Sequence, residues 1–482
     1  MTGSSATRAV RRTKLICTLG PATVHRIPEL FESGMDVARI NSSHGTSASR
    51  AETAAAVRSA AAAFGTPGTV MTDLSGPKIR MGELSVAEIE LEAGRRFVLR
   101  PNAPNVAPGD VHGVAVSYDG LARDVRPGDR ILVADGAVEL RVIAADADVV
   151  TEVVRGGTIR SRAGIAIPAD RLSAPAIGVK DREDLRAAIA FGTDLVAQSF
   201  VRGPADVLAL RELIGPDGPP IVAKIETRPA VLSFDAILDV VDAVMIARGD
   251  LGVEMPFEDV PVIQKQLVRR ALDRGVPSIV ATQMLESMTH AARPTRAEAS
   301  DVANAVFDGA DAIMLSGETA IGEHPVLAAR AAAAIAAACE SSGGAFLAPG
   351  TGRVPSSDVE ALAVAAVELA AATPDVAAIA CYTRTGATAR VLSARRPRVP
   401  IVAFSPDPAV VRRLGVVHGV VSRQVAALQQ SIDRVARLAE LVAGTGILPP
   451  GSAVVCVAST SRPGSAPNVL SIDRLPVSGS AG

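Results

Sequence analysis

A first cluster of residues suited to phosphate chemistry spans residues 39–45 (RINSSHG), directly after a short apolar run. The guanidinium of Arg39 offers a planar fork for a phosphate group, and the asparagine and serine side chains offer small oxygen ligands for a cation. The string also fits an ordinary capped loop that carries a surface arginine, with His44 as a hydrogen-bonded structural histidine. Taken alone, this cluster leaves both interpretations open.

A second cluster, residues 73–80 (DLSGPKIR), places a carboxylate at the end of an apolar run and follows it with a tight turn and two cations, Lys78 and Arg80. Such a set can hold a cation on one side and a phosphoryl group on the other. The sequence changes character directly afterwards, which predicts that this cluster lies at a hinge.

A third cluster suits a metal ion. Lys224 and Glu226 are two residues apart on a predicted strand, so their side chains point to the same side, and Asp250 follows the next strand. Two carboxylates with a lysine between them suit a Mg²⁺ ion that keeps some water and takes other ligands from substrate. Gly249 and Asp250 are expected to begin a short helix whose free N–H groups can receive an anion. A surface ion pair is the alternative.

Two hydroxyl groups follow further apolar runs: Thr282, in residues 281–288 (ATQMLESM), and Ser316, in residues 314–319 (MLSGET). Either hydroxyl can contact a substrate or cap the helix that follows it. For Ser316, helix capping is the preferred interpretation.

These clusters require a scaffold that brings strand ends together. Short β-branched runs recur along the chain, each followed by an Ala-rich stretch of helical length, which is typical of βα units with a parallel sheet. The predicted strands span residues 14–19, 37–40, 70–73, 195–199, 221–224, 243–246, 278–282 and 312–315. Eight βα units are what a closed barrel needs, and such barrels carry their chemistry at the carboxyl ends of the strands.

The βα pattern divides the chain into units. Between residues 83 and 178, Ala-rich helical stretches give way to alternating strand patterns with turn pairs such as Pro127-Gly128, which predicts an inserted β domain. The barrel would then comprise residues 1–82 and 179–343. A Gly/Pro/Ser-rich linker is expected at 344–357. Residues 358–482 form a smaller open α/β domain in this scheme, with strands at 377–382, 401–404 and 453–458.

Composition excludes several classes of protein. Hydrophobic residues make up 48% of the chain and the net charge is -2, which argues against a nucleic-acid-binding surface, as does the 2% aromatic content. The four cysteines form no CxxC pair, so neither a zinc site nor a disulfide framework is indicated and a cytoplasmic location is favoured. The apolar run 331–339 is shorter than the roughly 18 residues that a membrane span requires. No signal peptide or membrane association is expected.

The strings TLGPAT, ARINSSHG, GPKIR, KIE, ARGDLGVE, ATQMLESM and MLSGET, in this order, resemble those of pyruvate kinases. No single string is specific, but the set is, and it covers about residues 14–321. The resemblance implies a (β/α)8 TIM barrel with an inserted β-barrel-like lid domain and a C-terminal open α/β domain. It also implies Mg²⁺- or Mn²⁺-dependent transfer of the phosphoryl group of phosphoenolpyruvate to ADP, giving pyruvate and ATP, by a cytoplasmic homotetramer.

The resemblance also implies roles for individual residues. Catalysis would involve Arg39, Arg80, Lys224 and Thr282. Substrate would be bound by Arg39, Lys224, Gly249, Asp250 and Thr282, and nucleotide by Asn41, His44, Arg80 and Arg162. Mg²⁺ would be held by Glu226 and Asp250. A monovalent-cation site would be lined by Asn41, Ser43, Asp73 and the backbone of Leu74.

Two departures from the family pattern bear on these roles. Ala163 stands where a nucleotide-contacting lysine is usual, and the neighbouring Arg162 is the candidate to replace it. In the hinge cluster, Ser75 stands where many members have lysine and Lys78 where many have glutamate. Members with lysine at the latter position tend not to depend on a monovalent cation, so K⁺ is expected to be dispensable.

In the C-terminal domain, the string TRTGAT resembles the effector-binding loop of allosteric pyruvate kinases. A hydroxyl- and glycine-rich turn before a helix can hold a phosphate group, so a phosphorylated effector is expected there. The residues concerned are Thr383, Arg384, Thr385, Gly386 and Thr388. The alternative is an ordinary strand-to-helix turn.

Two other functions compete with the kinase. A lyase or aldolase could use a Mg²⁺-enolate site on the same barrel, although two phosphate-facing arginines and a lid argue against it. A catalytically silent metabolite sensor is the other. The presence of Lys224, Glu226, Asp250 and Thr282 argues against silence, whereas Ala163 keeps that alternative open.

Overall fold

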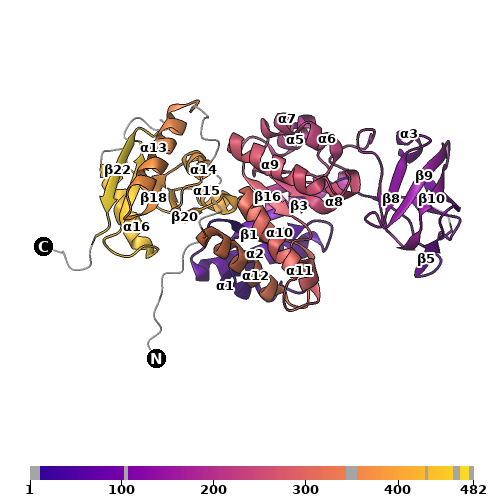
Figure 1. Cartoon of the computed structure of the whole chain (residues 1–482), viewed down its shortest axis with the longest axis horizontal. Helices are drawn as coiled ribbons and strands as arrows, with labels where there is room; N and C mark the ends of the chain where they lie inside the picture. Colours follow the sequence, from indigo (N-terminus) through magenta and orange to yellow (C-terminus); the bar gives the residue numbers. More distant parts are fainter. Residues whose placement is uncertain (1–10, 102–106, 343–354, 429–432, 460–466, 477–482) are drawn as a thin grey trace.

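The computed structural model describes residues 11–101, 107–342, 355–428, 433–459 and 467–476, which form three units (Figure 1). A helix-covered barrel lies between a β-rich unit, drawn in purple, and a C-terminal unit, drawn in orange and yellow. No described helix has both the length and the apolar character needed to cross a membrane.

Within the described residues, eight parallel strands close a barrel in the order β1-β17-β16-β15-β14-β13-β3-β2. The strands are β1 (Lys14–Thr18), β2 (Val37–Asn41), β3 (Thr69–Leu74), β13 (Leu195–Gln198), β14 (Ile221–Ile225), β15 (Ala243–Ala247), β16 (Ser278–Ala281) and β17 (Ala312–Leu315). Each strand coincides with one of the predicted runs. The barrel fold expected from the βα period is therefore confirmed.

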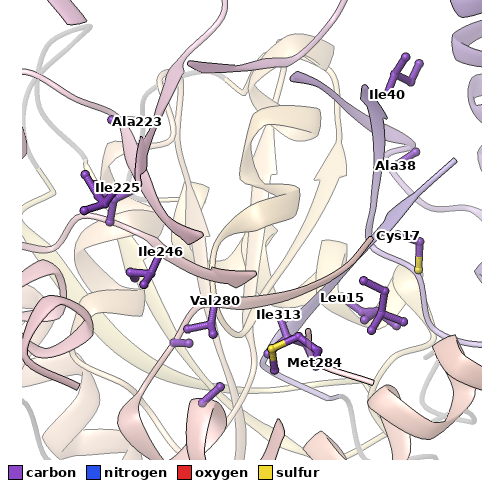
Figure 2. Close-up of a cluster of buried hydrophobic side chains, with 14 of the residues drawn as sticks. Leu15, Cys17, Ala38, Ile40, Ala223, Ile225, Ile246, Val280, Met284 and Ile313 are labelled. Atoms are coloured by element: carbon purple, nitrogen blue, oxygen red, sulfur yellow. The ribbon is translucent and has the colours of Figure 1, made fainter. Parts of the chain in front are cut away.

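Helices on the outside of the barrel are α1 (Ile27–Glu32), α2 (Ser47–Phe64), α4 (Val179–Ala190), α5 (Pro204–Ile214), α6 (Arg228–Leu232), α7 (Phe234–Leu238), α8 (Arg248–Glu254), α9 (Val260–Arg274), α10 (Arg296–Asp308), α11 (Gly317–Ala320) and α12 (Pro325–Ser341). Strand residues such as Leu15, Ile246 and Val280 pack in one core cluster with these helices, and Figure 2 shows them spread around the ring of strands. Alternate residues such as Ile16 and Met245 belong to a second cluster inside the barrel. Because both faces of the strands are buried, the runs are mostly apolar, and charged residues within them, such as Arg39 and Lys224, are buried as well.

The β-rich unit is inserted between β3 and α4. Its larger sheet has the strand order β4 (Ile79–Arg80), β12 (Gly164–Ala166), β8 (Arg130–Val133), β9 (Val138–Ala145), β10 (Val149–Arg155), β6 (Arg96–Pro101) and β7 (Gly113–Val116). The smaller sheet pairs β5 (Glu88–Leu91) with β11 (Gly157–Arg160). A short helix, α3 (Leu121–Asp124), lies between β7 and β8 in the chain. This unit has a hydrophobic core of its own, which includes Phe97 and Ile131. We call it the lid.

The C-terminal unit contains a five-stranded sheet in the order β20 (Val420–Gln424), β19 (Ile401–Ser405), β18 (Val376–Tyr382), β21 (Ala453–Ala458) and β22 (Val469–Arg474). Its helices are α13 (Asp358–Ala372), α14 (Ala387–Ala394), α15 (Pro408–Arg413) and α16 (Asp433–Thr445). Strands β18, β19 and β21 match the predicted runs, whereas β20 and β22 were not predicted. The predicted linker, residues 344–357, lies outside the described residues except for 355–357.

The C-terminal unit covers the amino-terminal end of the barrel strands. Arg396, just after α14, donates hydrogen bonds of 3.0 and 2.9 Å to the two carboxylate oxygens of Asp311, just before β17. Lys14 Nζ, at the start of β1, donates to the carbonyl oxygen of Val420 at 2.8 Å. The apolar cluster inside the barrel continues into this unit, reaching Leu414 and Val417. One end of the barrel is thereby closed, and the carboxyl ends of the strands remain for chemistry.

Candidate active site

A buried network of charged groups lies at the carboxyl ends of β2, β3 and β14. Arg39 Nε donates to Asp73 Oδ2 at 2.8 Å, and Arg39 Nη1 donates to Thr18 Oγ1 at 2.9 Å. Lys224 Nζ lies 2.6 Å from Glu226 Oε1 and 3.5 Å from Asp73 Oδ1. Arg39 and Lys224 are each only 8% exposed. The alternatives of a surface arginine and a surface Lys-Glu pair are therefore wrong.

The charges in this network set each other's protonation. Burial alone would raise the pKa of Asp73, but Lys224 and Arg39 outweigh it and hold that pKa below its ordinary value. Burial alone would lower the pKa of Lys224, but Asp73 and Glu226 outweigh it and raise that pKa. Lys224 is therefore a fixed cation at neutral pH.

Glu226 differs from Asp73 because its charge is less well compensated. Burial raises the pKa of Glu226, and the nearby Asp250 adds to the effect, although Lys224 opposes it. Glu226 Oε2 accepts a hydrogen bond of 2.8 Å from the N–H of Phe200. Glu226 Oε1 is in ionic contact with Lys224 but has no hydrogen bond of acceptable geometry. An additional cation at this oxygen would compensate the remaining negative charge of Glu226.

Glu226 and Asp250 both line a cavity of about 620 Å³ between the barrel and the lid. Within the described part of the chain, no three or more His, Cys, Asp or Glu side chains are grouped so that they could hold a metal ion. Two carboxylates at a cavity, one of them with a buried oxygen that contacts the Lys224 ammonium, fit Mg²⁺, which keeps several waters and takes further ligands from a substrate.

Thr282, directly after β16, contacts the first turn of α8. Its Oγ1 accepts a hydrogen bond of 2.7 Å from the N–H of Gly249 and donates one of 2.6 Å to the carbonyl of Ala281. Thr282 has φ 70° and Gln283 φ 53°, a left-handed conformation that costs energy for residues other than glycine. Arg248 holds this turn by donating to the Thr282 carbonyl at 2.7 Å. Thr282 and Gly249 are thus brought together.

Ser316 does not act as predicted. It occupies the N-cap position of α11, but its side chain forms no capping hydrogen bond. Instead, the buried carboxylate of Glu318 accepts a hydrogen bond of 2.7 Å from the N–H of Ser316. The capping interpretation of the Ser316 hydroxyl is wrong, because this hydroxyl accepts no hydrogen bond from the first turn of α11.

The predicted ligands of the monovalent cation lie together beside the charged network. Asn41 Oδ1 accepts from the N–H of Ser43 at 3.0 Å, and Ser43 Oγ lies 2.9 Å from Ser75 Oγ. Lys78 is exposed in the segment that joins β3 to β4, and its charge adds to those of Lys224 and Arg39, which lower the pKa of Asp73 more strongly. The positive charge of Lys78 therefore acts on Asp73, one of the predicted cation ligands.

The predicted nucleotide-binding residues are divided between the two units. Arg80 and Arg162 line the cavity from the lid side, and Arg80 Nη1 donates to the Arg162 carbonyl at 3.0 Å. Arg162 Nε donates to Glu83 Oε1 at 2.6 Å. His44 is exposed on the loop after β2, and Ala163 packs partly into the lid core.

Sequence reasoning missed three residues at this site. Ser199, at the end of β13, accepts a hydrogen bond of 2.8 Å from Lys224 Nζ and donates one of 2.7 Å to the Leu74 carbonyl. Its hydroxyl follows an apolar run just as that of Thr282 does, so the same signal was present. Arg160 and Arg202 add further cations to the cavity wall. Nothing in their sequence surroundings distinguishes them from surface arginines.

The TRTGAT loop lies in the C-terminal unit between β18 and α14. The buried Thr383 accepts a hydrogen bond of 2.9 Å through its Oγ1 from the N–H of Gly386, which has φ 84° and so requires glycine. Arg384 and Thr385 are exposed, and Thr388 lies in the first turn of α14.

Comparisons with known proteins agree with this geometry. Residues 10–329 match the model of the pyruvate kinase barrel domain, and residues 360–472 match that of the pyruvate kinase alpha/beta domain. A pyruvate kinase of Bacillus licheniformis is 39% identical over 473 residues, covering 96% of this chain and 80% of the relative. A pyruvate kinase of Mycobacterium tuberculosis is 42% identical over 414 residues, covering 85% of this chain and 86% of the relative.

A solved structure shares the whole architecture. The crystal structure of a pyruvate kinase from Cryptosporidium parvum superposes with a TM-score of 0.88 at 34% identity, covering 97% of this chain and 96% of the other. The matches extend over the barrel, the lid and the C-terminal unit, and the charged network lies where the sequence strings placed it. The chain belongs to the pyruvate kinase family.

Proposed function

We propose that the charged network at the barrel mouth transfers the phosphoryl group of phosphoenolpyruvate to ADP. The observation that carries the proposal is Lys224, a buried cation held between Asp73 and Glu226 beside the cavity that separates barrel and lid. Its test is the formation of pyruvate from phosphoenolpyruvate and ADP with Mg²⁺. A catalytically silent sensor would form none, and a lyase would form none that depends on ADP.

Phosphoryl transfer depends mainly on positioning and on stabilising negative charge. In this proposal Arg39 and Arg80 bind the phosphoryl group, and Lys224 stabilises the charge that develops as the enolate leaves. Gly249, Asp250 and Thr282 bind the carboxylate end of the substrate. Thr282 lies on the face where the enolate carbon accepts its proton, which gives pyruvate.

Mg²⁺ or Mn²⁺ would be held by Glu226 and Asp250, and it would neutralise charge on the phosphoryl and enolate oxygens. Asn41, His44, Arg80 and Arg162 contact the nucleotide in this proposal. Arg162 stands beside Ala163 and lines the cavity, which supports its role as replacement for the usual lysine. Closure of the lid over the barrel mouth would exclude water and align ADP with the phosphoryl group.

Glu226→Gln and Asp250→Asn should each raise the Mg²⁺ concentration needed for half-maximal activity by at least about tenfold, because each removes an anionic ligand from a site with few protein ligands. Equilibrium binding of Mn²⁺ should weaken in parallel. Glu254→Gln is the matched control, because Glu254 lines the same cavity without being a proposed ligand. An unchanged metal titration in both ligand variants would assign the metal elsewhere.

A phosphorylated effector is proposed for the loop formed by Thr383, Arg384, Thr385, Gly386 and Thr388. The exposed Arg384 and Thr385 support it, because their donors are available to a phosphate group. A sugar phosphate or nucleoside monophosphate should shift the phosphoenolpyruvate saturation curve, and Thr385→Glu should abolish the shift by repulsion. No shift with any such ligand, or a shift that survives Thr385→Glu, would leave the loop as an ordinary turn.

Assembly and location follow from family membership as proposals. We place the enzyme in the cytoplasm as a homotetramer. Strongly exposed apolar side chains of the barrel unit, Leu232, Phe257 and Ile321, support burial against other subunits.

A further inference from the structure

Two stretches of chain connect the lid to the barrel. The first connection runs from the end of β3 to β4, and the second runs from β12 to α4. Asp181, in the first turn of α4, contacts both. Its Oδ1 accepts a hydrogen bond from the N–H of Gly76 in the first connection at 3.0 Å, and its Oδ2 accepts one from the N–H of Gly178 in the second connection, also at 3.0 Å. Asp181 is 3% exposed.

Other side chains hold only one connection. Ser199 binds the Leu74 carbonyl in the first, and Arg202 Nη1 donates to the Leu172 carbonyl in the second at 2.5 Å. Among the described residues, Asp181 is the one whose side-chain hydrogen bonds reach both connections. The two oxygens of the Asp181 carboxylate thus fix the distance between the two connections at the point where they leave the barrel.

The first connection is also confined by packing. Gly76 has φ 66°, and a Cβ atom at this position would lie 2.9 Å from Phe200 Cδ2 and 3.0 Å from Ser199 Cβ. The chain therefore lies directly against the end of β13. Lys78 and Arg80 follow within four residues, so the place of Gly76 determines where these two cations stand at the cavity.

We propose that Asp181 is a positioning residue that joins the two connections into one hinge, so that the lid presents Arg80 to the nucleotide phosphates in a fixed place. The inference rests on the proposed closure of the lid. A simple helix-capping role is the alternative, because the bond to Gly178 matches one half of a capping box. Capping does not require the second oxygen or the bond to Gly76.

Asp181→Asn tests the proposal, because the amide keeps the size of the side chain but has a single acceptor oxygen and cannot bind both N–H groups. We expect KM for ADP to rise and kcat to fall, each by about three- to tenfold, since a hydrogen bond to a charged acceptor is lost. KM for phosphoenolpyruvate should change by less than about twofold, because Arg39, Lys224 and Thr282 belong to the barrel. Hydrogen exchange at the amide of Gly76 or Gly178 should accelerate at least about tenfold.

Asp308→Asn is the matched control. Asp308 is also a buried carboxylate, and it accepts hydrogen bonds from Gln264 and Lys265 on the outside of the barrel, so the same charge is removed away from the lid. Its variant should keep wild-type constants and wild-type exchange at both glycines. If Asp181→Asn behaves like this control, the hinge role is overturned.

Two further outcomes distinguish a failure of the hinge proposal from a failure of the proposed phosphoryl transfer. If Asp181→Asn fails to fold, Gly76→Ala displaces the same connection and should give the same rise in KM for ADP; wild-type constants in that variant would overturn the proposal. If the wild-type enzyme forms no pyruvate, the proposed function fails, whereas exchange at Gly76 and Gly178 still measures whether Asp181 holds both connections.

Discussion

Substitution of Lys224 by Met is expected to lower kcat for phosphoryl transfer by about 10²- to 10³-fold, with a much smaller change in KM for phosphoenolpyruvate. The raised pKa of Lys224 keeps its side chain charged in the free enzyme, and the cation is already in place when charge develops on the enolate. Methionine has similar length and fills the same space without the charge. The loss should therefore appear in the transition state rather than in the binding of substrate.

The measurement is the initial rate of pyruvate formation at saturating substrates, together with thermal unfolding and Mn²⁺ binding of the variant. Lys265→Met is the matched control, because Lys265 pairs with Asp308 on the outside of the barrel. A Lys224→Met enzyme that folds and keeps a tenth or more of wild-type turnover would remove Lys224 from the mechanism. Loss of folding would instead show that Asp73 and Glu226 need the lysine as a counter-ion.

The wild-type enzyme should not require K⁺, and Lys78→Glu should become activated by K⁺ at least about tenfold. The oxygen ligands Asn41, Ser43 and Asp73 are all present, and Lys78 already contributes positive charge at Asp73. A lysine ammonium is a compact point charge and can supply what a bound cation would otherwise contribute. With glutamate at this position the local charge reverses, and the site needs a cation.

Turnover should be measured with KCl replaced by tetramethylammonium chloride at constant ionic strength, because screening alone alters the binding of charged substrates. Lys265→Glu controls for the change in net charge. Tenfold or greater activation of the wild-type enzyme by K⁺ would defeat the hypothesis. Absence of K⁺ activation in Lys78→Glu would favour the plainer alternative, in which the exposed Lys78 only pairs with a carboxylate of the lid.

The barrel could be predicted from the sequence because its strands are buried on both faces and therefore read as apolar runs. Strand β22 was missed for the opposite reason: it lies at the edge of its sheet, and its residues are partly exposed, so no apolar run marks it. Strand alternation also predicted correctly that Lys224 and Glu226 share one side.

The parts of the site that escaped prediction depend on contacts between distant segments. Asp181 looks like a helix-capping residue in the sequence, and its second hydrogen bond is to a residue 105 positions away. The cap predicted for Ser316 was wrong because a hydroxyl just before a helix looks like a cap in the sequence, whereas in the structure the buried Glu318 bonds the N–H groups of Ser316 and of the distant Leu285. Local patterns identify residue types at strand ends, whereas the partner of each side chain is decided by the barrel order.

One apolar cluster runs from the barrel interior into the C-terminal unit, so we expect these two units to unfold together. Separate family models match residues 10–329 and 360–472, yet Met71 and Leu414 belong to one continuous core. A chain that ended after α12 would expose the apolar residues at the amino-terminal end of the barrel strands to water. A chain without the lid would lose only the lid's own separate core. We therefore expect the barrel to stay folded without the lid but not without the C-terminal unit.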